Sequence, residues 1–171
     1  MSEDSRPAWS QQFLASALKD LQSSGPLGGI DSVWAWGGST GKGIKVAVVD
    51  SGIEAEHPAI GGQWHGGVIV NYDGRTRSRV RFEEDHERID LYGHGTACAG
   101  IIHSIAPEAE LYSVRVLGRD LTGRAYQFAG GLRWAIDNGM QVINLSLSTG
   151  REEYFGLFHE LADDAYFKNC L

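Results

Sequence analysis

The alternation of apolar and polar segments along the chain predicts strands and helices that follow one another in turn. Short runs of apolar, mostly β-branched residues are typical of strands buried on both faces of a parallel sheet. Such runs lie at residues 44–49, 67–72, 109–118 and 141–148. Helical spacing of apolar residues is found at residues 9–21, 93–105, 123–140 and 152–171. This alternation, without an internal repeat, predicts an α/β fold: a parallel sheet with helices on both faces.

A charged segment separates the second expected strand from the helix at residues 93–105. It consists of the basic stretch RTRSRVR at residues 75–81, followed by the acidic stretch EEDHERID at residues 83–90. Blocks of opposite charge this close together favour a solvated loop or hairpin over a binding patch. The net charge of −7 also argues against nucleic-acid binding, which requires a basic surface. We therefore expect no nucleic-acid partner.

Composition also bears on the membrane and on the cellular compartment. No apolar run approaches the roughly 18 residues that a membrane-spanning helix needs. The first residues, MSEDSRPAWS, lack the basic and then apolar pattern of a secretory signal. The two cysteines, Cys98 and Cys170, are too few for a disulfide framework. These features predict a cytoplasmic protein without a membrane partner.

Two residues lie at positions where α/β folds commonly have their functional sites. Asp50 directly follows the strand at residues 44–49, and His94 begins a helix. Ligands of such folds bind beyond the carboxyl ends of the strands. An isolated aspartate in this position is most often a turn former, and an isolated histidine at a helix start is most often structural. The sequences around the two residues therefore decide how they are interpreted.

The stretches VAVVDSGIEAEHP around Asp50 and GHGTACAGII around His94 resemble the aspartate and histidine motifs of the subtilisin-like serine peptidases, or subtilases. The resemblance extends over roughly residues 30 to 150. It implies a partial subtilisin-like catalytic domain at residues 25–171, incomplete at its C-terminal side. Residues 1–24 are expected to form a short N-terminal helical extension.

The resemblance implies an Asp/His/Ser triad that hydrolyses peptide bonds. Histidine titrates near neutral pH and can accept a proton from a weak nucleophile, which is the role expected of His94. A carboxylate, here Asp50, would hold the imidazole in one tautomer and stabilise the imidazolium. The substrate would be a peptide or protein in extended conformation.

Two further segments are implied to contact that substrate. Leu121, Thr122 and Gly123 match an edge that pairs with an extended peptide through backbone hydrogen bonds. Ser146, Leu147 and Ser148 match the opposite side and one wall of the primary specificity pocket, although the family commonly has glycine in place of Ser148. Ala125 and Phe128 match positions that help form a more distal pocket.

The family's nucleophile motif, G-T-S-x-[AS], and its oxyanion-hole asparagine are both absent from these 171 residues. The chain alone is therefore expected to be inactive. Three interpretations remain open: an N-terminal portion of a peptidase, one half of a split peptidase completed by a partner chain, and a non-catalytic peptide- or protein-binding module. An open sheet edge would favour a complementing chain or a homo-oligomer in each case.

Cys98 and metal ions complete the candidate chemistry. Cys98 lies one helical turn after His94 and on the same face, so it would lie beside the imidazole instead of across a cleft. The resemblance to thiol-bearing subtilases also implies a buried neighbour of the base, not a nucleophile. Calcium is implied by the family, but no segment shows calcium-ligand spacing. We therefore assign no metal ligands and expect no other cofactor.

Overall fold

The computed structural model describes residues 35–171. Two compact units are present, Met1–Gly38 and Ser39–Leu171. In the first unit, Ala35 and Trp36 lie in a helical turn. The helix expected at residues 9–21, and with it the extension at residues 1–24, lies outside the described residues.

The second unit is built around one five-stranded sheet with the strand order β3-β2-β4-β1-β5. In chain order its elements are β1 (Lys45–Asp50), η1 (Pro58–Ile60), β2 (Trp64–Tyr72), β3 (Val80–Glu84), α3 (His94–Ile105), β4 (Glu110–Arg115), α4 (Ala125–Asp137), β5 (Val142–Asn144), η2 (Glu152–Tyr154) and α5 (Phe155–Phe167). Strands β2, β4, β1 and β5 run parallel, and β3 pairs antiparallel with β2 at one edge. The predicted α/β fold is confirmed, and the charged segment forms part of the β2–β3 turn, strand β3 and the loop that follows it.

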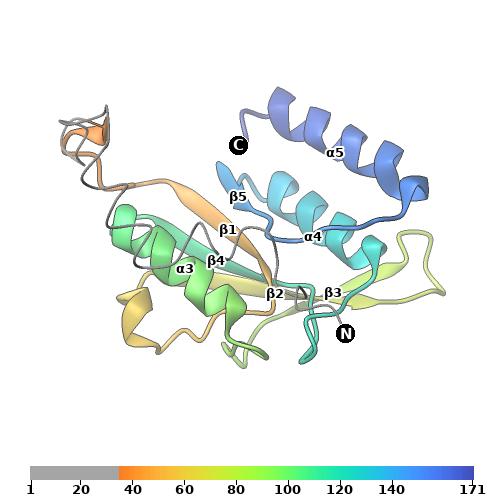
Figure 1. The fold of residues 1–171 in the computed structure, drawn as a ribbon, viewed down its shortest axis with the longest axis horizontal. Coiled ribbons are helices and arrows are strands. Elements are labelled where there is room, and N and C mark those ends of the chain that lie inside the picture. The colour runs from red at the N-terminus through yellow and green to blue at the C-terminus, as the bar shows by residue number, and fades with distance from the viewer. Residues whose placement is uncertain (1–34) are drawn as a thin grey trace, which may run out of the picture. The chain divides into compact units, whose positions relative to one another are not determined.

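Side chains of the inner strand β1 point alternately into two cores. Val46 and Val48 pack with the core beneath α3, while Ala47 and Val49 pack with the core beneath α4. This alternation is what a strand covered on both faces requires, because successive side chains point to opposite sides. Helix α5 packs on the outer side of α4. Figure 1 shows the resulting layers, with α3 on one side of the sheet and α4 and α5 on the other.

The C-terminal elements are shorter than the sequence predicted. The strand expected at residues 141–148 is regular only over β5, and α5 ends at Phe167. Asn169 then adopts the left-handed conformation, with φ at 55°, and this turns the chain back toward β5. Leu171 donates from its N–H to the carbonyl of Gln141 at 2.9 Å and accepts from the N–H of Ile143 at 2.7 Å. Leu171 is therefore hydrogen-bonded along the outer edge of β5.

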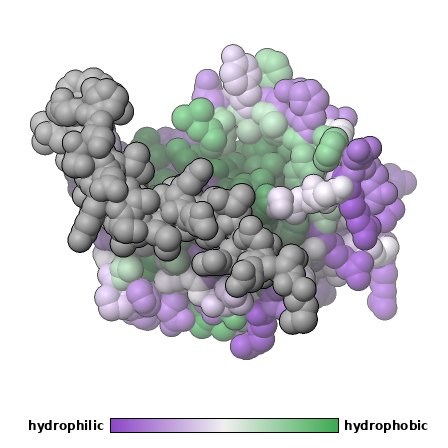
Figure 2. Space-filling model, viewed as in Figure 1, coloured by the Kyte–Doolittle hydropathy of each residue, from purple (hydrophilic) through white to green (hydrophobic). Residues whose placement is uncertain are grey.

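Hydrophobic residues gather in the middle of the face seen in Figure 2, and hydrophilic residues predominate toward its right-hand side and lower rim. The middle of that face corresponds to the region between α3 and α4 in Figure 1. Of the helices in the described part of the chain, none combines the length and the apolar character needed to cross a membrane.

Candidate active site

Asp50 is the last residue of β1, at the point where this inner strand leaves the sheet. Its side chain is completely buried. The backbone N–H of Ser51 donates to Asp50 Oδ1 at 2.7 Å, which fixes one carboxylate oxygen in place. Gly52 follows with φ at 118°, and the chain turns there to form a β-bridge with Asp90. The second carboxylate oxygen, Oδ2, is left to accept from another element.

That second oxygen accepts a hydrogen bond from His94, the first residue of α3. The distance from His94 Nδ1 to Asp50 Oδ2 is 2.8 Å. Because an ionised carboxylate can only accept, the ring carries its proton on Nδ1, and Nε2 of the neutral ring keeps a free lone pair. The His94 side chain is 40% exposed, whereas that of Asp50 is fully enclosed. A buried orienting carboxylate and a partly open base are thus held together.

A glycine makes the short distance between the two residues sterically feasible. Gly95 lies directly against the turn after β1, and a Cβ there would collide with the carbonyl oxygen of Gly52. The same Cβ would lie 3.1 Å from the Cβ of Asp50. Only a residue without a side chain lets the first turn of α3 come this close to β1. The glycine that follows His94 therefore sets the spacing of the pair.

Asp90 fixes the turn that leads into α3, and the sequence analysis missed it. Its Oδ1 accepts from the backbone N–H groups of Tyr92 and Gly93 at 2.9 and 2.8 Å. Its Oδ2 accepts from the N–H and the hydroxyl of Thr96 at 2.8 and 2.7 Å. The Ser51 hydroxyl lies 2.7 Å from Oδ1, which links this network to the residue after Asp50. One carboxylate thus ties the start of α3 to the end of β1.

The charge of Asp90 follows from these contacts. Burial raises the pKa of the Asp90 carboxyl, but hydrogen bonds from Gly93, Tyr92 and Thr96 lower it by more than burial raises it. The pKa of Asp90 therefore lies below its ordinary value. An acidic residue ahead of a helix often accepts from free N–H groups there, but the sequence does not show that the Asp90 carboxylate faces those groups. We therefore regard Asp90 as a positioning residue for His94.

Cys98 lies beside the imidazole, as predicted, and is partly buried. Its Sγ is 3.9 Å from Nδ1 and 4.0 Å from Nε2 of His94, so it lies along the lone-pair direction of neither nitrogen. It is also 4.0 Å from the hydroxyl of Ser146. Burial raises the pKa of the Cys98 thiol, which keeps it protonated at neutral pH. These features argue against Cys98 as a nucleophile activated by His94.

The same three side chains also deserve consideration as metal ligands. Asp50, His94 and Cys98 each offer a ligand atom, and these atoms lie within 4.8 Å of one another. However, Nδ1 and Oδ2 already share a hydrogen bond at 2.8 Å, and Sγ is not aligned with a ring nitrogen. The arrangement therefore fits an acid–base pair better than a metal centre.

The first predicted substrate segment forms a tight loop. Thr122 accepts from the N–H of Gly118 at 2.9 Å, and Leu121 adopts φ of 55°, which is uncommon for a residue other than glycine. In the part of the chain that the structure describes, the N–H and C=O groups of Gly123 have no hydrogen-bond partner. A Cβ at Gly123 would approach the Phe128 ring to 2.6 Å. Gly123 is therefore the residue of this segment that can pair with an extended chain.

The second predicted segment lies after β5, and the structure brings part of it close to the first. Gly123 and Ser148 line a common cavity of about 400 Å³, together with Ala125 and Phe128. Leu147 and Ser148 also line a smaller, more apolar cavity of about 240 Å³ that shares Phe128. Ser146 lies on the other side, near Cys98 and the Asp50–His94 pair. The two segments thus border one region between the pair and α4.

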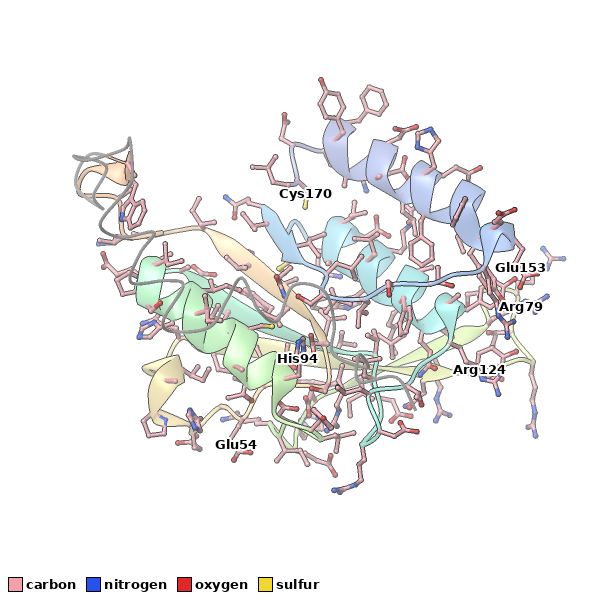
Figure 3. All side chains as sticks on the ribbon, in the orientation of Figure 1. Glu54, Arg79, His94, Arg124, Glu153 and Cys170 are labelled. Atoms are coloured by element: carbon pink, nitrogen blue, oxygen red, sulfur yellow. The ribbon has the colours of Figure 1, made fainter. Side chains whose placement is uncertain are left out.

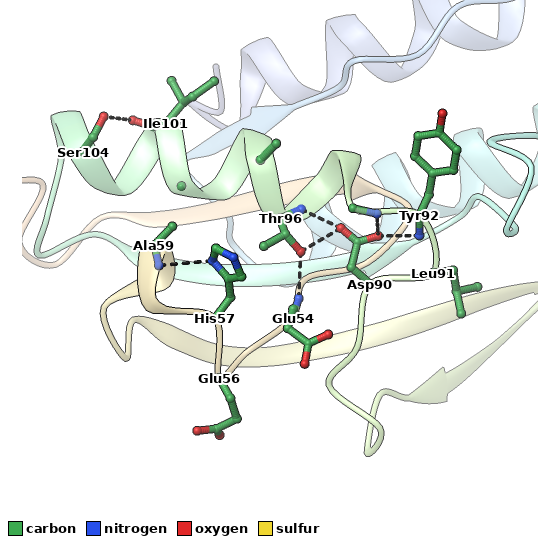
Figure 4. A pocket seen from close by; sticks show the side chains of 13 residues that line it. Glu54, Glu56, His57, Ala59, Asp90, Leu91, Tyr92, Thr96, Ile101 and Ser104 are labelled. Atoms are coloured by element: carbon green, nitrogen blue, oxygen red, sulfur yellow. Dashed lines mark hydrogen bonds between the residues drawn. The ribbon is translucent and has the colours of Figure 1, made fainter.

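A cavity of about 800 Å³ lies next to the turn that carries His94 (Figure 4), but neither Asp50 nor His94 lines it. Its wall includes His57 and Asp90. His57 Nδ1 accepts from the N–H of Ala59 at 3.2 Å and caps η1, so this motif histidine has a structural role. The Glu54 N–H donates to the Thr96 hydroxyl at 3.0 Å, another link between the β1 turn and α3.

None of the serines in the described residues is hydrogen-bonded to His94. Ser113 is completely buried within β4. Ser104, near the far end of α3, donates to the carbonyl of Ile101 at 2.7 Å. Ser146 accepts from the side chain of Asn144 at 3.2 Å. The geometry thus supplies a base and its orienting carboxylate within residues 35–171, without a serine placed for activation by that base.

Comparison with known proteins places this geometry in context. A family model described as "Subtilase family" matches residues 41–166. The chain is 36% identical over 133 residues to Minor extracellular protease Vpr of Bacillus subtilis (strain 168), covering 74% of this chain and 16% of that protein. It is 39% identical over 125 residues to Subtilisin BL of Lederbergia lenta, covering 66% of this chain and 40% of that protein. For Minor extracellular protease Epr of B. subtilis (strain 168), the identity is 34% over 148 residues, covering 80% of this chain and 20% of that protein. The chain therefore spans well under half the length of these relatives.

These relatives also correct one expectation. The absence of a signal-like segment and the two cysteines predicted a cytoplasmic protein. That prediction is wrong, because the similar proteins Vpr and Epr are both named as extracellular proteases. The prediction failed because two free cysteines do not distinguish an intracellular protein from an extracellular one.

Proposed function

The chain belongs to the subtilase family, and on that premise we propose that it supplies the general base, the orienting carboxylate and one side of the substrate cleft of a subtilisin-type serine peptidase. The observation that carries this proposal is the hydrogen bond of 2.8 Å between His94 Nδ1 and the fully buried Asp50 carboxylate. A surface histidine with a structural role would not need a buried carboxylate held in place by a second element.

In the proposed reaction, Nε2 of His94 accepts the proton of a serine hydroxyl as that oxygen attacks the scissile carbonyl. Asp50 keeps the imidazole in the Nδ1–H tautomer and stabilises the imidazolium that forms. His94 then returns the proton to the leaving amine. The serine and the oxyanion donor come from polypeptide other than these 171 residues, which contain neither motif. Without them, little of the rate enhancement remains.

The substrate is proposed to bind as an extended chain. The N–H and C=O groups of Gly123, which have no hydrogen-bond partner within residues 35–171, can pair with a peptide backbone. Ser146, Leu147 and Ser148 would line the opposite side of that chain. The cavity shared by Gly123 and Ser148 supports this arrangement, because a peptide lying between the segments would direct a side chain into it.

A non-catalytic peptide-binding module is the second candidate. It is favoured by the fact that the two features proposed to bind a peptide, the Gly123 backbone and the cavity beside it, are present in this chain and need no nucleophile. Both candidates predict peptide binding, and they differ in whether His94 ever activates a serine.

Reconstitution of the site tests the peptidase proposal. The chain is mixed with a separately produced segment of Subtilisin BL that carries its nucleophilic serine, and a fluorophosphonate probe reports whether that serine becomes reactive. We expect labelling with the wild-type chain and with Cys98→Ser, and its loss with His94→Ala or Asp50→Ala. His159→Ala, an exposed histidine on α5, serves as the matched control and should label normally.

Two outcomes would contradict the proposal. Labelling that is unaffected by His94→Ala would show that His94 is not the base. A complex that forms, detected by size-exclusion chromatography, yet never labels the serine would favour the non-catalytic module.

A further inference from the structure

Three arginines from separate parts of the chain line the cavity of about 400 Å³ beside Gly123. Arg79 comes from the β2–β3 hairpin, Arg124 immediately precedes α4, and Arg151 immediately precedes η2. Figure 3 shows Arg79 and Arg124 close to Glu153 at one end of the sheet, at a distance from His94. Because the whole chain carries a net charge of −7, this basic group is a local exception.

Aromatic rings hold two of these guanidinium groups. The Arg79 guanidinium carbon lies 4.8 Å from the centre of the Tyr126 ring, and that of Arg124 lies 4.5 Å from the centre of the Tyr72 ring. Tyr126 is itself packed edge-on against Tyr154 at 5.6 Å. Stacking on a ring face leaves the N–H donors at the edge of the guanidinium plane available. The two arginines are therefore oriented, and among residues 35–171 their guanidinium groups form no hydrogen bond.

The backbone around Arg79 also helps to hold its side chain in the cavity wall. Arg79 has φ of 58°, a conformation that residues other than glycine seldom adopt. Its carbonyl accepts from the N–H of Asp73 at 2.8 Å, and its N–H donates to the carbonyl of Thr76 at 3.2 Å. The turn thus places the Arg79 side chain in the cavity wall at some expense in backbone strain.

Within the described residues, acidic side chains neutralise the positive charge of the cavity only in part. Within residues 35–171, neither Arg79 nor Arg124 forms an ion pair. Arg151 has one carboxylate partner, Glu153, at 3.6 Å, and both of these side chains are largely exposed. A cavity lined by three arginines, of which one forms an ion pair within residues 35–171, has an excess of positive charge in its wall, which attracts an anionic group.

We propose that this cavity is a specificity site for a peptide with an aspartate or glutamate side chain at a position distant from the scissile bond. The inference rests on the proposed function, because Gly123 and Ser148, which border the cavity, belong to the segments proposed to hold the extended substrate. A carboxylate entering the cavity would accept hydrogen bonds from Arg79 and Arg124. Ser148 and Thr149 form the opposite wall and can add neutral donors.

Peptide binding to the intact chain tests this inference. The probe is a short, fluorescently labelled, alanine-rich peptide in which a single glutamate is moved through successive positions, with a matching series that carries glutamine. Fluorescence anisotropy gives the dissociation constants. At one position we expect the glutamate peptide to bind about tenfold more tightly than its glutamine counterpart, with the difference shrinking as salt is added.

Arginine variants identify the side chains responsible. Arg79→Gln and Arg124→Gln should each reduce the preference for glutamate several-fold, and the double variant should abolish it. Arg77→Gln removes the same charge from the same hairpin at an exposed residue that does not line the cavity, and it should retain the preference. Circular dichroism of each variant checks that the fold is intact.

The alternative outcomes separate the two proposals. Equal affinity for the glutamate and glutamine series at every position would overturn the acidic specificity and leave the substrate cleft standing. A preference that survives the double variant would also overturn it. If neither series binds at any position, both the cavity's role and the proposed substrate cleft are wrong.

Discussion

The two helices that cover opposite faces of the sheet differ in what lies outside them. Helix α4 is enclosed between the sheet and α5, with Leu132 and Ile136 packed against Leu161. Helix α3 buries only its inner side, and its outward residues Ile101 and Ile105 are 63% and 51% exposed. His94, the proposed general base, is the first residue of α3. The proposal thus assigns stability and function to different layers, and it places the Asp50–His94 pair at the end of a helix and not along its body.

The largest expected effect is on the free energy of unfolding, and it tests whether α4 contributes more to stability than α3 does. Ile136→Ala and Leu161→Ala each remove side chains buried between α4 and α5, and we expect each to lower the free energy of unfolding by about 2–4 kcal/mol. Ile101→Ala on α3 should change it by less than about 0.5 kcal/mol, because that side chain is exposed. Urea denaturation monitored by circular dichroism measures all three. Equal losses on α3 and α4 would break the comparison.

Gly95→Ala tests whether the close approach of α3 to β1 positions the active pair. The added methyl group collides with the carbonyl of Gly52, and overpacking of this kind costs about 1–3 kcal/mol. We expect the His94–Asp50 hydrogen bond to be lost in the same variant, with a changed His94 ring signal in NMR spectra.

Gly156→Ala in α5 is the matched control for that change. A Cβ at Gly156 meets nothing within 4 Å, so replacement of a helical glycine should stabilise the chain by about 0.5–1 kcal/mol. A Gly95→Ala variant that is as stable as the wild type, with an unchanged His94 signal, would be incompatible with the proposed role of Gly95.

Asp90→Ala removes the carboxylate that anchors the first turn of α3, and we expect a loss of about 1–2 kcal/mol at neutral pH. Because the folded-state pKa of Asp90 lies below its ordinary value of 3.8, its ionised form stabilises the fold above that value. This contribution is lost as the pH falls from there through the folded-state pKa. The stability difference between wild type and variant, measured by urea denaturation, should therefore shrink in acid. A difference that grows in acid would reverse the assignment.

The smallest effect concerns Cys98. Since burial raises the pKa of its thiol above the ordinary value of 9.0, alkylation by iodoacetamide should accelerate only at a pH above that value. The measurement uses a Cys170→Ser background, so that Cys98 is the one thiol present. Rapid alkylation at neutral pH would instead indicate a thiolate stabilised by His94, which would make Cys98 a candidate nucleophile.

The sequence predicted those elements that a residue pattern within one segment of the chain defines. The β-branched run that forms β1 and the helical spacing of apolar residues at 93–105 were sufficient to predict a buried strand and a helix. Asp90 was missed because its role depends on the direction of backbone N–H groups, which a residue pattern does not reveal. The shortened β5 and the return of Leu171 to the sheet depend on the left-handed turn at Asn169.

Features formed by residues that are far apart in the sequence were the hardest to predict from it. The arginine-lined cavity joins side chains at positions 79, 124 and 151, which meet only because the β2–β3 hairpin lies near the start of α4. The charged segment alone was interpreted as solvated, and most of it is exposed. Arg79 is exposed like its neighbours, but its guanidinium group also stacks on the Tyr126 ring, which the sequence did not reveal.

The protonation of the His94 ring tests the central claim most directly. Nitrogen-15 NMR of the histidine-labelled chain distinguishes a proton on Nδ1 from one on Nε2. We predict that neutral His94 carries its proton on Nδ1, bound to Asp50, and that Asp50→Asn shifts the proton to Nε2 because the asparagine amide can donate to Nδ1. A wild-type ring protonated on Nε2, or a ring unaffected by Asp50→Asn, would contradict the assignment of Asp50 and His94 as a catalytic pair.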